Sequence, residues 1–189
     1  MGDYSRAAGK CVAKYAATRA KLQAKASGSG ATCDNPRLVD NGDGTVTDRL
    51  TGLQWEKKTN LDSAPNPFDP HDADNTYTWN ATGAPADGTT FTDFPTTLNS
   101  GRFAGQCDWR LPTRDELLTI ASPGYPACIT ATEPRIDPVF GPTVAFNYWS
   151  ATTLAAYPGD AWNVSFAPGS VYIGGSTAAN NVRAVRSGS

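Results

Sequence analysis

The sequence predicts an α+β domain with short antiparallel strands, two main helices and long loops. Three observations support this class. Tight-turn residues separate short β-prone runs, a capping box opens a helix, and large apolar residues alternate with small polar ones near the C-terminus. The 189 residues suffice for one domain and a short appendage. With 39% hydrophobic residues, including five Trp, seven Tyr and seven Phe, the chain can form a core, which excludes a disordered protein.

The appendage is predicted over residues 1–33 and the domain over residues 34–189. Residues 4–26 are rich in Ala, Lys, Arg and Leu, with apolar residues near helical spacing. This pattern predicts an amphipathic helix with a basic outer face. Ser and Gly at 27–30 end the helix and predict a flexible connector. Packing on the domain or on a partner subunit is favoured for this helix over binding to a membrane surface.

The domain is predicted to begin with a hairpin. Residues 37–40 and 45–48 flank Asn41-Gly42-Asp43-Gly44. Asn-Gly and Asp-Gly tolerate the positive φ angles of tight turns, so this run predicts a turn between two strands. A further turn leads into a predicted strand over residues 53–56.

The middle of the chain predicts a long loop followed by helices. Four prolines interrupt residues 60–93, and a helix is expected to begin near Asp93. Residues 108–112 form a short extended segment ended by proline. Thr113, with Glu116 three positions later, forms a capping box that predicts a second helix running to about residue 120.

The C-terminal third predicts hairpins and a closing strand over residues 182–186. Residues 161–167 alternate, which places Trp162, Val164 and Phe166 inward and Asn163, Ser165 and Ala167 outward. Beyond a Pro-Gly turn, Val171 and Ile173 are predicted to return inward. Because Trp162 is predicted to be a core residue, its replacement by Ala is expected to lower the unfolding free energy of the protein by about 3–5 kcal/mol.

Charge is distributed unevenly along the chain. The 16 basic and 18 acidic residues give a net charge of −2 and form no basic tract, so nucleic-acid binding is not favoured. No stretch approaches the roughly 20 apolar residues of a membrane span. Asp160 is the single charged residue within 141–182, where the chain-wide 18% corresponds to about eight. The stretch is instead rich in small, hydroxyl, amide and Tyr side chains, which are typical of adaptable binding surfaces. The alternative is a sheet surface of small polar residues that binds no ligand.

Candidate reactive and metal-ligating residues are few. The sequence contains no nucleophile elbow, P-loop or dinucleotide fingerprint. If the protein is exported, the four cysteines predict the pairs Cys11–Cys33 and Cys107–Cys128, with four free thiols as the alternative. No cofactor is expected. An acidic loop offers three weak metal candidates, for which a solvated loop is favoured over a structural calcium site. These candidates are Asp69, Asp72 and Asp74.

Three ordered stretches carry a family resemblance. The first runs over residues 40–55, the second over residues 107–117, and the third joins Tyr148-Trp149-Ser150 and Ala161-Trp162 to residues 182–186. Together they resemble the domain family named after the C-terminal domain of a bacterial collagen-like adhesin, over roughly residues 36–187. The resemblance implies a C-type-lectin-like fold, distantly similar to the formylglycine-generating enzyme. That enzyme needs reactive cysteines late in its domain, and this chain has none there, so no catalysis is expected.

The resemblance also implies a binding function. Many members of this fold group are variable proteins of diversity-generating retroelements, which suggests a diversified C-terminal surface here. We therefore expect an exported, cell-surface or extracellular protein that binds a protein or a neutral glycan, without nucleic acid or membrane insertion; its oligomeric state is not predicted. The alternatives are a fixed glycan-binding adhesin and, less favoured, a formylglycine-type oxidase. The expected ligand-binding residues are Leu154, Ala156, Tyr157, Gly159, Asp160, Asn163, Ser165, Ala167, Ser170, Tyr172 and Gly174. The expected structural residues are Trp55, Trp109, Arg110, Trp149, Trp162 and Arg183.

Overall fold

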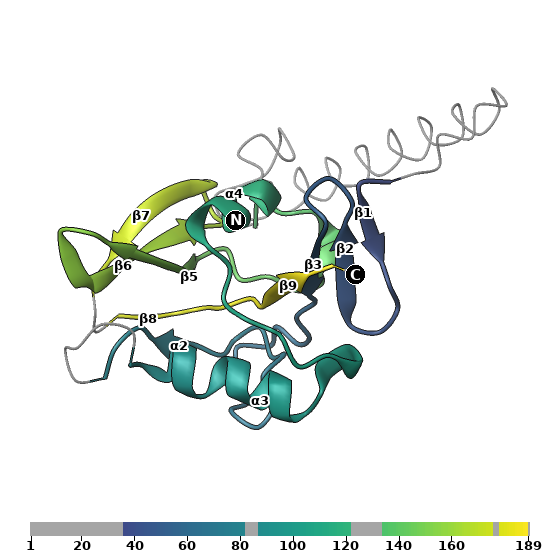
Figure 1. Cartoon of the computed structure of the whole chain (residues 1–189), viewed down its shortest axis with the longest axis horizontal. Helices are drawn as coiled ribbons and strands as arrows, with labels where there is room; N and C mark the ends of the chain where they lie inside the picture. Colours follow the sequence, from purple (N-terminus) through teal and green to yellow (C-terminus); the bar gives the residue numbers. More distant parts are fainter. Residues whose placement is uncertain (1–35, 82–86, 122–133, 176–177, 189) are drawn as a thin grey trace, which may run out of the picture.

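The computed structural model describes residues 36–81, 87–121, 134–175 and 178–188, which form a mixed α+β domain with three small antiparallel sheets (Figure 1). The α+β class is therefore confirmed. The predicted N-terminal helix and its connector lie outside the described residues, as do Cys11, Cys33 and Cys128.

The first sheet has the strand order β1-β2-β3-β9, all antiparallel. The predicted hairpin is confirmed: Gly42 and Gly44 adopt φ angles of +77° and +87° in the turn, a region that favours glycine. The last strand pairs with β3, so the closing strand is confirmed, although it begins later than predicted. The four strands are β1 (Leu38–Asp40), β2 (Thr45–Asp48), β3 (Leu53–Glu56) and β9 (Val185–Ser187).

Residues 178–188 connect the parts of the domain. Within them, β8 (Ala179–Asn180) pairs with β4 (Tyr77–Thr78) in a two-stranded sheet. Asn181 forms a parallel bridge with Tyr148, and Val185 forms an antiparallel bridge with Arg110. In Figure 1 this yellow segment runs between the third sheet and the two lower helices toward the first sheet.

The third sheet consists of β5 (Asn147–Leu154), β6 (Tyr157–Ser165) and β7 (Ser170–Gly174) in that order. Its register places Trp149 opposite Asn163 and Asn163 opposite Tyr172. Each strand is antiparallel to the next, and β7 is an edge strand of this sheet.

Three short α-helices complete the described fold. The predicted helix near Asp93 is seen as α2 (Thr89–Thr92) and α3 (Phe94–Ser100), which are separated at that residue. Helix α4 (Arg114–Ile120) starts at the predicted capping box. The backbone N–H of Glu116 donates to Thr113 Oγ1 at 3.2 Å, and the backbone N–H of Thr113 donates to Glu116 Oε2 at 2.7 Å. The capping box is therefore confirmed.

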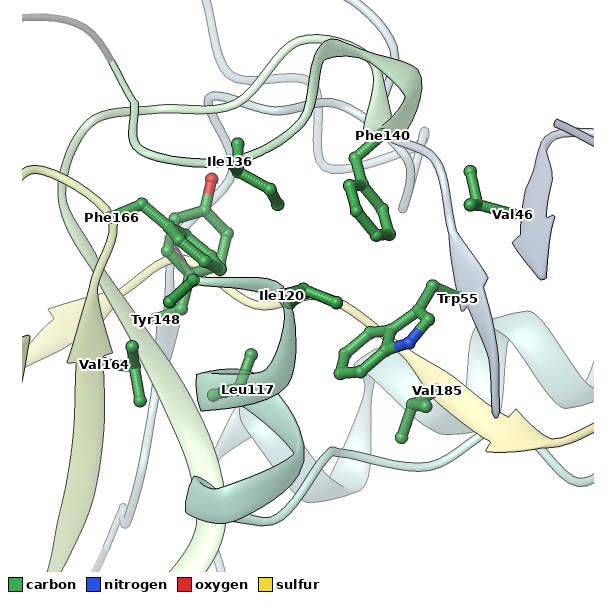
Figure 2. Packing of buried hydrophobic residues seen from close by; sticks show 11 residues of the cluster. Val46, Trp55, Leu117, Ile120, Ile136, Phe140, Tyr148, Val164, Phe166 and Val185 are labelled. Atoms are coloured by element: carbon green, nitrogen blue, oxygen red, sulfur yellow. The ribbon is translucent and has the colours of Figure 1, made fainter. Parts of the chain in front are cut away.

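The core consists of two clusters on opposite faces of the third sheet. Figure 2 shows the first, where α4, the first sheet and the third sheet meet around Trp55, Ile120 and Phe140. The second cluster contains Trp79, Phe94, Leu98, Trp109 and Trp149. Tyr148 and Val164 belong to the first cluster and their neighbours Trp149 and Ala161 to the second.

Because both faces of the third sheet are covered at its centre, the predicted inward and outward sets are partly wrong. Val164 and Phe166 are fully buried, as predicted. Trp162 is only partly buried, with the guanidinium of Arg114 5.5 Å from its ring centre, and Ile173 is 52% exposed. Trp162 and Ile173 are paired in the register of β6 and β7, and Arg114 at the start of α4 contacts Trp162 without burying it fully.

Candidate functional site

The predicted ligand-binding residues differ widely in exposure. Four are exposed to solvent: Ala156, Tyr157, Ser170 and Tyr172. Four are partly buried: Leu154, Gly159, Asp160 and Ala167. Three are buried: Asn163, Ser165 and Gly174.

The expectation that the three buried residues face solvent is wrong. The register places all three on the face of the third sheet that also carries Trp149. A Cβ atom added at Gly174 would overlap the Trp149 ring and meet Asn163 Nδ2 at 2.6 Å, so this position requires glycine. Asn163 is 1% exposed, and its Oδ1 has no hydrogen-bond partner among the described residues. Alternation identifies the shared face, but the second core cluster covers it.

An exposed surface remains at the tip and outer edge of the third sheet. We call it the hairpin surface and define it as Ala155, Ala156, Tyr157, Ser170, Tyr172 and Ile173. Its large side chains are well exposed, with Tyr157 at 66% and Tyr172 at 46%. Along β6, Tyr157 lies six positions before the partner of Tyr172, about 20 Å at strand spacing. The hairpin surface is therefore elongated and carries no charged side chain, and it wraps around the edge of the sheet, because Tyr172 and Ile173 point to opposite faces of β7. Ile173 was not among the predicted binding residues, because alternation assigned it to the core.

The predicted structural residues are mostly interior. Trp55, Trp109, Trp149 and Arg183 are at most 2% exposed, whereas Arg110 and Trp162 are partly buried. The guanidinium of Arg110 donates to both carboxylate oxygens of Glu116, at 2.8 and 2.7 Å. This fork lowers the pKa of Glu116, with burial opposing it, and fixes the start of α4.

The segment before α4 also supports the third sheet. The backbone N–H of Ala151 donates to the carbonyl of Pro112 at 2.7 Å, and the N–H of Arg114 donates to Thr152 Oγ1 at 3.0 Å. Inside the sheet, Ser150 Oγ donates to the carbonyl of Trp162 at 2.6 Å. The second half of β5 is thus held by hydrogen bonds, while Ala155, Ala156 and Tyr157 at the tip stay exposed.

A largely buried polar cluster lies in the interior, and Arg183 is the one member of it that the sequence predicted as a structural residue. We call it the polar centre and define it as Glu56, Lys58, His71 and Arg183. Arg183 donates to the carbonyls of Glu56 and Phe140 at 2.7 and 3.0 Å. Its second terminal nitrogen donates to Thr143 Oγ1 at 2.8 Å. The side chain thus links segments up to 127 residues apart. Its buried environment lowers the pKa of Arg183.

The carboxylate of Glu56 is surrounded by donors. Lys58 Nζ lies 3.0 Å and His71 Nδ1 2.9 Å from Oε1, and the backbone N–H of Ala184 donates to Oε2 at 2.9 Å. Burial raises the pKa of Glu56, but these three partners outweigh it, so the pKa lies below its ordinary value. Burial lowers the pKa of Lys58 despite the nearby carboxylate. A charged residue directly after the buried Trp55 was the available sequence signal.

The three candidate metal ligands, Asp69, Asp72 and Asp74, accept hydrogen bonds from the backbone of their own loop. Asp69 accepts from the N–H of His71, and Asp72 accepts from the N–H of Asp74. One oxygen of Asp74 accepts from the N–H groups of Asp62 and Ser63, both at 2.8 Å. Within the described residues, no group of three or more His, Cys, Asp and Glu side chains is placed to hold a metal ion. These carboxylates order their own loop through hydrogen bonds to its backbone.

Cys107 is an exposed free thiol in this structure. The predicted Cys107–Cys128 bridge is therefore not formed in it. Cys107 lies at the surface directly before the extended segment that leads to Trp109.

Two hollows open on the surface beside α2 and α3. One, of about 430 Å³, has mainly apolar walls that include Phe91, Pro95, Trp109 and Leu111. The other, of about 240 Å³, has mixed walls. We call it the α3 hollow and define it by its lining residues: Pro67, Pro70, Asn75, Thr76, Tyr77, Thr89, Asp93, Phe94 and Thr97.

Comparison with known proteins gives one family. The model of the family described as the Lcl C-terminal domain matches residues 44–186. This range contains all three sheets except β1 and the end of β9, and it includes the hairpin surface, the polar centre and both hollows. No curated protein and no solved structure matches the chain. Among the described residues, no helix has the length and apolar character needed to cross a bilayer.

Proposed function

Because the chain belongs to the Lcl C-terminal domain family, found in collagen-like adhesins, we propose that it is a non-enzymatic binding protein whose ligand contacts the hairpin surface. The family is not known as catalytic, and its association with adhesins supports a binding role. An exported, surface or extracellular location and a C-type-lectin-like fold are parts of this proposal.

The character of the hairpin surface carries the proposal. Tyr157, Tyr172 and Ile173 expose large apolar area, and aromatic side chains of this kind supply most of the binding energy in protein interfaces. Tyr adds contact area at low cost in side-chain entropy. The surface also follows β7, an uncharged edge strand whose outer backbone groups offer hydrogen bonds to a partner. A protein ligand fits these features best.

The absence of basic residues disfavours anionic ligands. No Lys or Arg occurs within residues 141–182, and Arg114, which lies 5.5 Å from the centre of the Trp162 ring, is already paired with Asp115 at 2.8 Å. Sulfated or uronate-rich glycans bind through such cations. A fixed adhesin for a neutral glycan is the remaining alternative at this surface.

We also propose that the exposed positions of the hairpin surface are the ones that retroelement diversification would change. Asn163, Ser165 and Gly174 are excluded from this set because they pack inside the sheet. The test is genomic. A near-copy of the 3′ coding sequence that differs at adenines, beside a reverse transcriptase gene, is the expected observation. Differences that fall at the buried codons, or no such repeat, would contradict diversification and favour a fixed adhesin.

Display of two matched libraries tests the binding role. The first randomises the six residues of the hairpin surface. The second randomises six exposed residues elsewhere: Thr51, Asn60, Asp62, Ser63, Thr92 and Thr96. Both are selected against one immobilised protein of known structure, such as an egg-white lysozyme.

Binders recovered from the first library at a clearly higher frequency than from the second are the expected result. Equal recovery from both libraries would show that the hairpin surface has no special capacity for binding. As a separate check on the absence of catalysis, a peptide thiol oxidation assay is expected to show no turnover. Turnover there would support the oxidase alternative instead.

A further inference from the structure

We propose that the α3 hollow is a second binding site, separate from the hairpin surface, and that it takes a single ring of a neutral sugar. The hollow lies between the loop that contains Pro67 and Pro70 and the residues of β4, α2 and α3. It shares no residue with the hairpin surface, so the two sites stand or fall independently.

The size and walls of the hollow limit the occupant. Its volume of about 240 Å³ is below the roughly 300–1,000 Å³ of pockets for drug-sized ligands, which leaves room for about one ring. Pro67, Pro70, Tyr77 and Phe94 provide apolar walls, against which the C–H face of a pyranose can pack. Thr76, Thr89 and Thr97 also line the hollow. The hydroxyl of Thr97 donates to the carbonyl of Asp93 at 2.8 Å, and that of Thr89 accepts from the N–H of Thr78 at 3.0 Å, so each keeps capacity for a further hydrogen bond to a ring hydroxyl.

The charge of the hollow disfavours anionic ligands. Asp93 is its charged lining residue, and its carboxylate accepts from Thr92 Oγ1 at 2.7 Å. A carboxylate has about four acceptor positions, so capacity remains for ligand hydroxyls. The same carboxylate repels anions. Lys58 Nζ already lies 4.6 Å from the centre of the Phe94 ring, but its charge is paired with Glu56 at 3.0 Å, so the cationic probe below tests whether the hollow prefers a cation to a neutral ring.

The walls are held in place before a ligand arrives. Asn75 Nδ2 donates to the carbonyls of Asn66 and Asp69, both at 2.8 Å, which fixes the loop against β4. The Tyr77 and Phe94 rings pack at 5.2 Å between centres, and Phe94 is fully buried. A preformed site loses little conformational entropy on binding, so even the few contacts that a small ligand makes can hold it.

Titration followed by amide NMR tests the proposal with the whole chain. The probes are the methyl pyranosides of glucose, galactose and mannose, each added to ¹⁵N-labelled protein. At least one probe is expected to give saturable shifts at Thr76, Tyr77 and Thr97, with a Kd of about 1 mM. Glucuronate and n-butylamine serve as an anionic and a cationic comparison, and neither is expected to saturate the same amides.

Matched variants separate direct contact from a general effect. Asp93→Asn removes the charge but keeps the shape, and it is expected to weaken binding about tenfold. The side chain of Asp93 forms no capping bond to α3, so the fold is expected to persist, which the dispersion of the spectrum reports. Thr97→Val is expected to weaken binding, whereas Thr96→Val, on the same helix but outside the hollow, is the control and is expected to change nothing.

Three outcomes would overturn the proposal. These are no saturable shift at the lining amides with any neutral probe, saturation by glucuronate or butylamine alone, and equal weakening by Thr96→Val and Thr97→Val. None of these results bears on the hairpin surface. Failure of the library selection would likewise leave this site unaffected.

Discussion

The polar centre and the hairpin surface differ in charge: the first contains several charged side chains, and the second contains none. In the polar centre, the charged side chains of Glu56, Lys58 and Arg183 are buried, His71 is partly buried, and each of the four residues contacts another residue through its charged or ring group. In the hairpin surface, charge is absent and the large side chains project into solvent. The first arrangement fixes one structure, because an unpaired buried charge is strongly unfavourable. The second leaves side chains free to contact a partner.

This contrast suggests that stability and binding reside in different parts of the chain. Residues that link distant segments, such as Arg183, are expected to be intolerant of change. Residues of the hairpin surface are expected to be tolerant. The experiments below test whether this division holds, beginning with the largest expected effect.

Removing the positive charge of Arg183 should lower the unfolding free energy the most. Arg183→Met is expected to lose about 3–5 kcal/mol of unfolding free energy, because the carbonyls of Glu56 and Phe140 and the hydroxyl of Thr143 lose a buried donor. Urea denaturation followed by Trp fluorescence measures it. The exposed Arg49→Met is the control and should change stability by less than about 0.5 kcal/mol. Similar losses in both variants would remove the distinction between buried and exposed cations.

A pair of tryptophans on neighbouring strands sharpens the comparison. Trp149 is fully buried in the second cluster, so Trp149→Ala is expected to lose about 3–5 kcal/mol. Trp162 is partly buried, and Trp162→Ala is now expected to lose about 1 kcal/mol rather than the loss of a core truncation. The same denaturation experiment ranks them. A larger loss at Trp162 would restore the alternation-based interpretation.

The capping box gives a smaller effect that depends on pH. The hydrogen bond from Arg110 lowers the pKa of Glu116 in the folded state, with burial opposing and the Thr113 N–H assisting. A depressed pKa contributes stability above the unfolded value of about 4.3, and this stability is lost as the pH falls through the folded value. Glu116→Gln is therefore expected to lose about 1 kcal/mol at pH 7 and progressively less below about pH 4.3.

Denaturation curves at several pH values measure this difference between the wild type and Glu116→Gln. The matched control is Asp115→Asn, because Asp115 is 75% exposed and lies outside the capping box. It is expected to change stability little. A difference between wild type and Glu116→Gln that stays constant from pH 7 to pH 3 would contradict the ionic role of Glu116.

Much of the fold follows from short-range sequence signals. The two glycines of the first turn and the Thr113–Glu116 capping box each depend on residues a few positions apart, and the structure contains both as predicted. Helix breaks and strand ends were less accurate, because they depend on tertiary packing. A helix was predicted to begin near Asp93, where α3 does begin, but the short helix α2 before it was not predicted.

The candidate site was harder to predict because its determinants are non-local. Alternation reports which residues share a face of β6, yet it carries no information that Trp149 and Gly174 close over Asn163. The partners of Arg183 lie 127 and 43 residues away in the chain. Composition also does not show that the carboxylates of the acidic loop accept from their own backbone.

The most direct test of the division between framework and binding surface is one stability measurement on a combined variant. Tyr157→Ser, Ser170→Asn and Tyr172→Ser together change three exposed positions of the hairpin surface. The urea unfolding free energy is expected to stay within about 1 kcal/mol of the wild type, since exposed substitutions cost little. Replacing Asn163 and Ser165 together is expected to cost clearly more. A loss in the combined surface variant as large as that of Trp149→Ala would contradict the account.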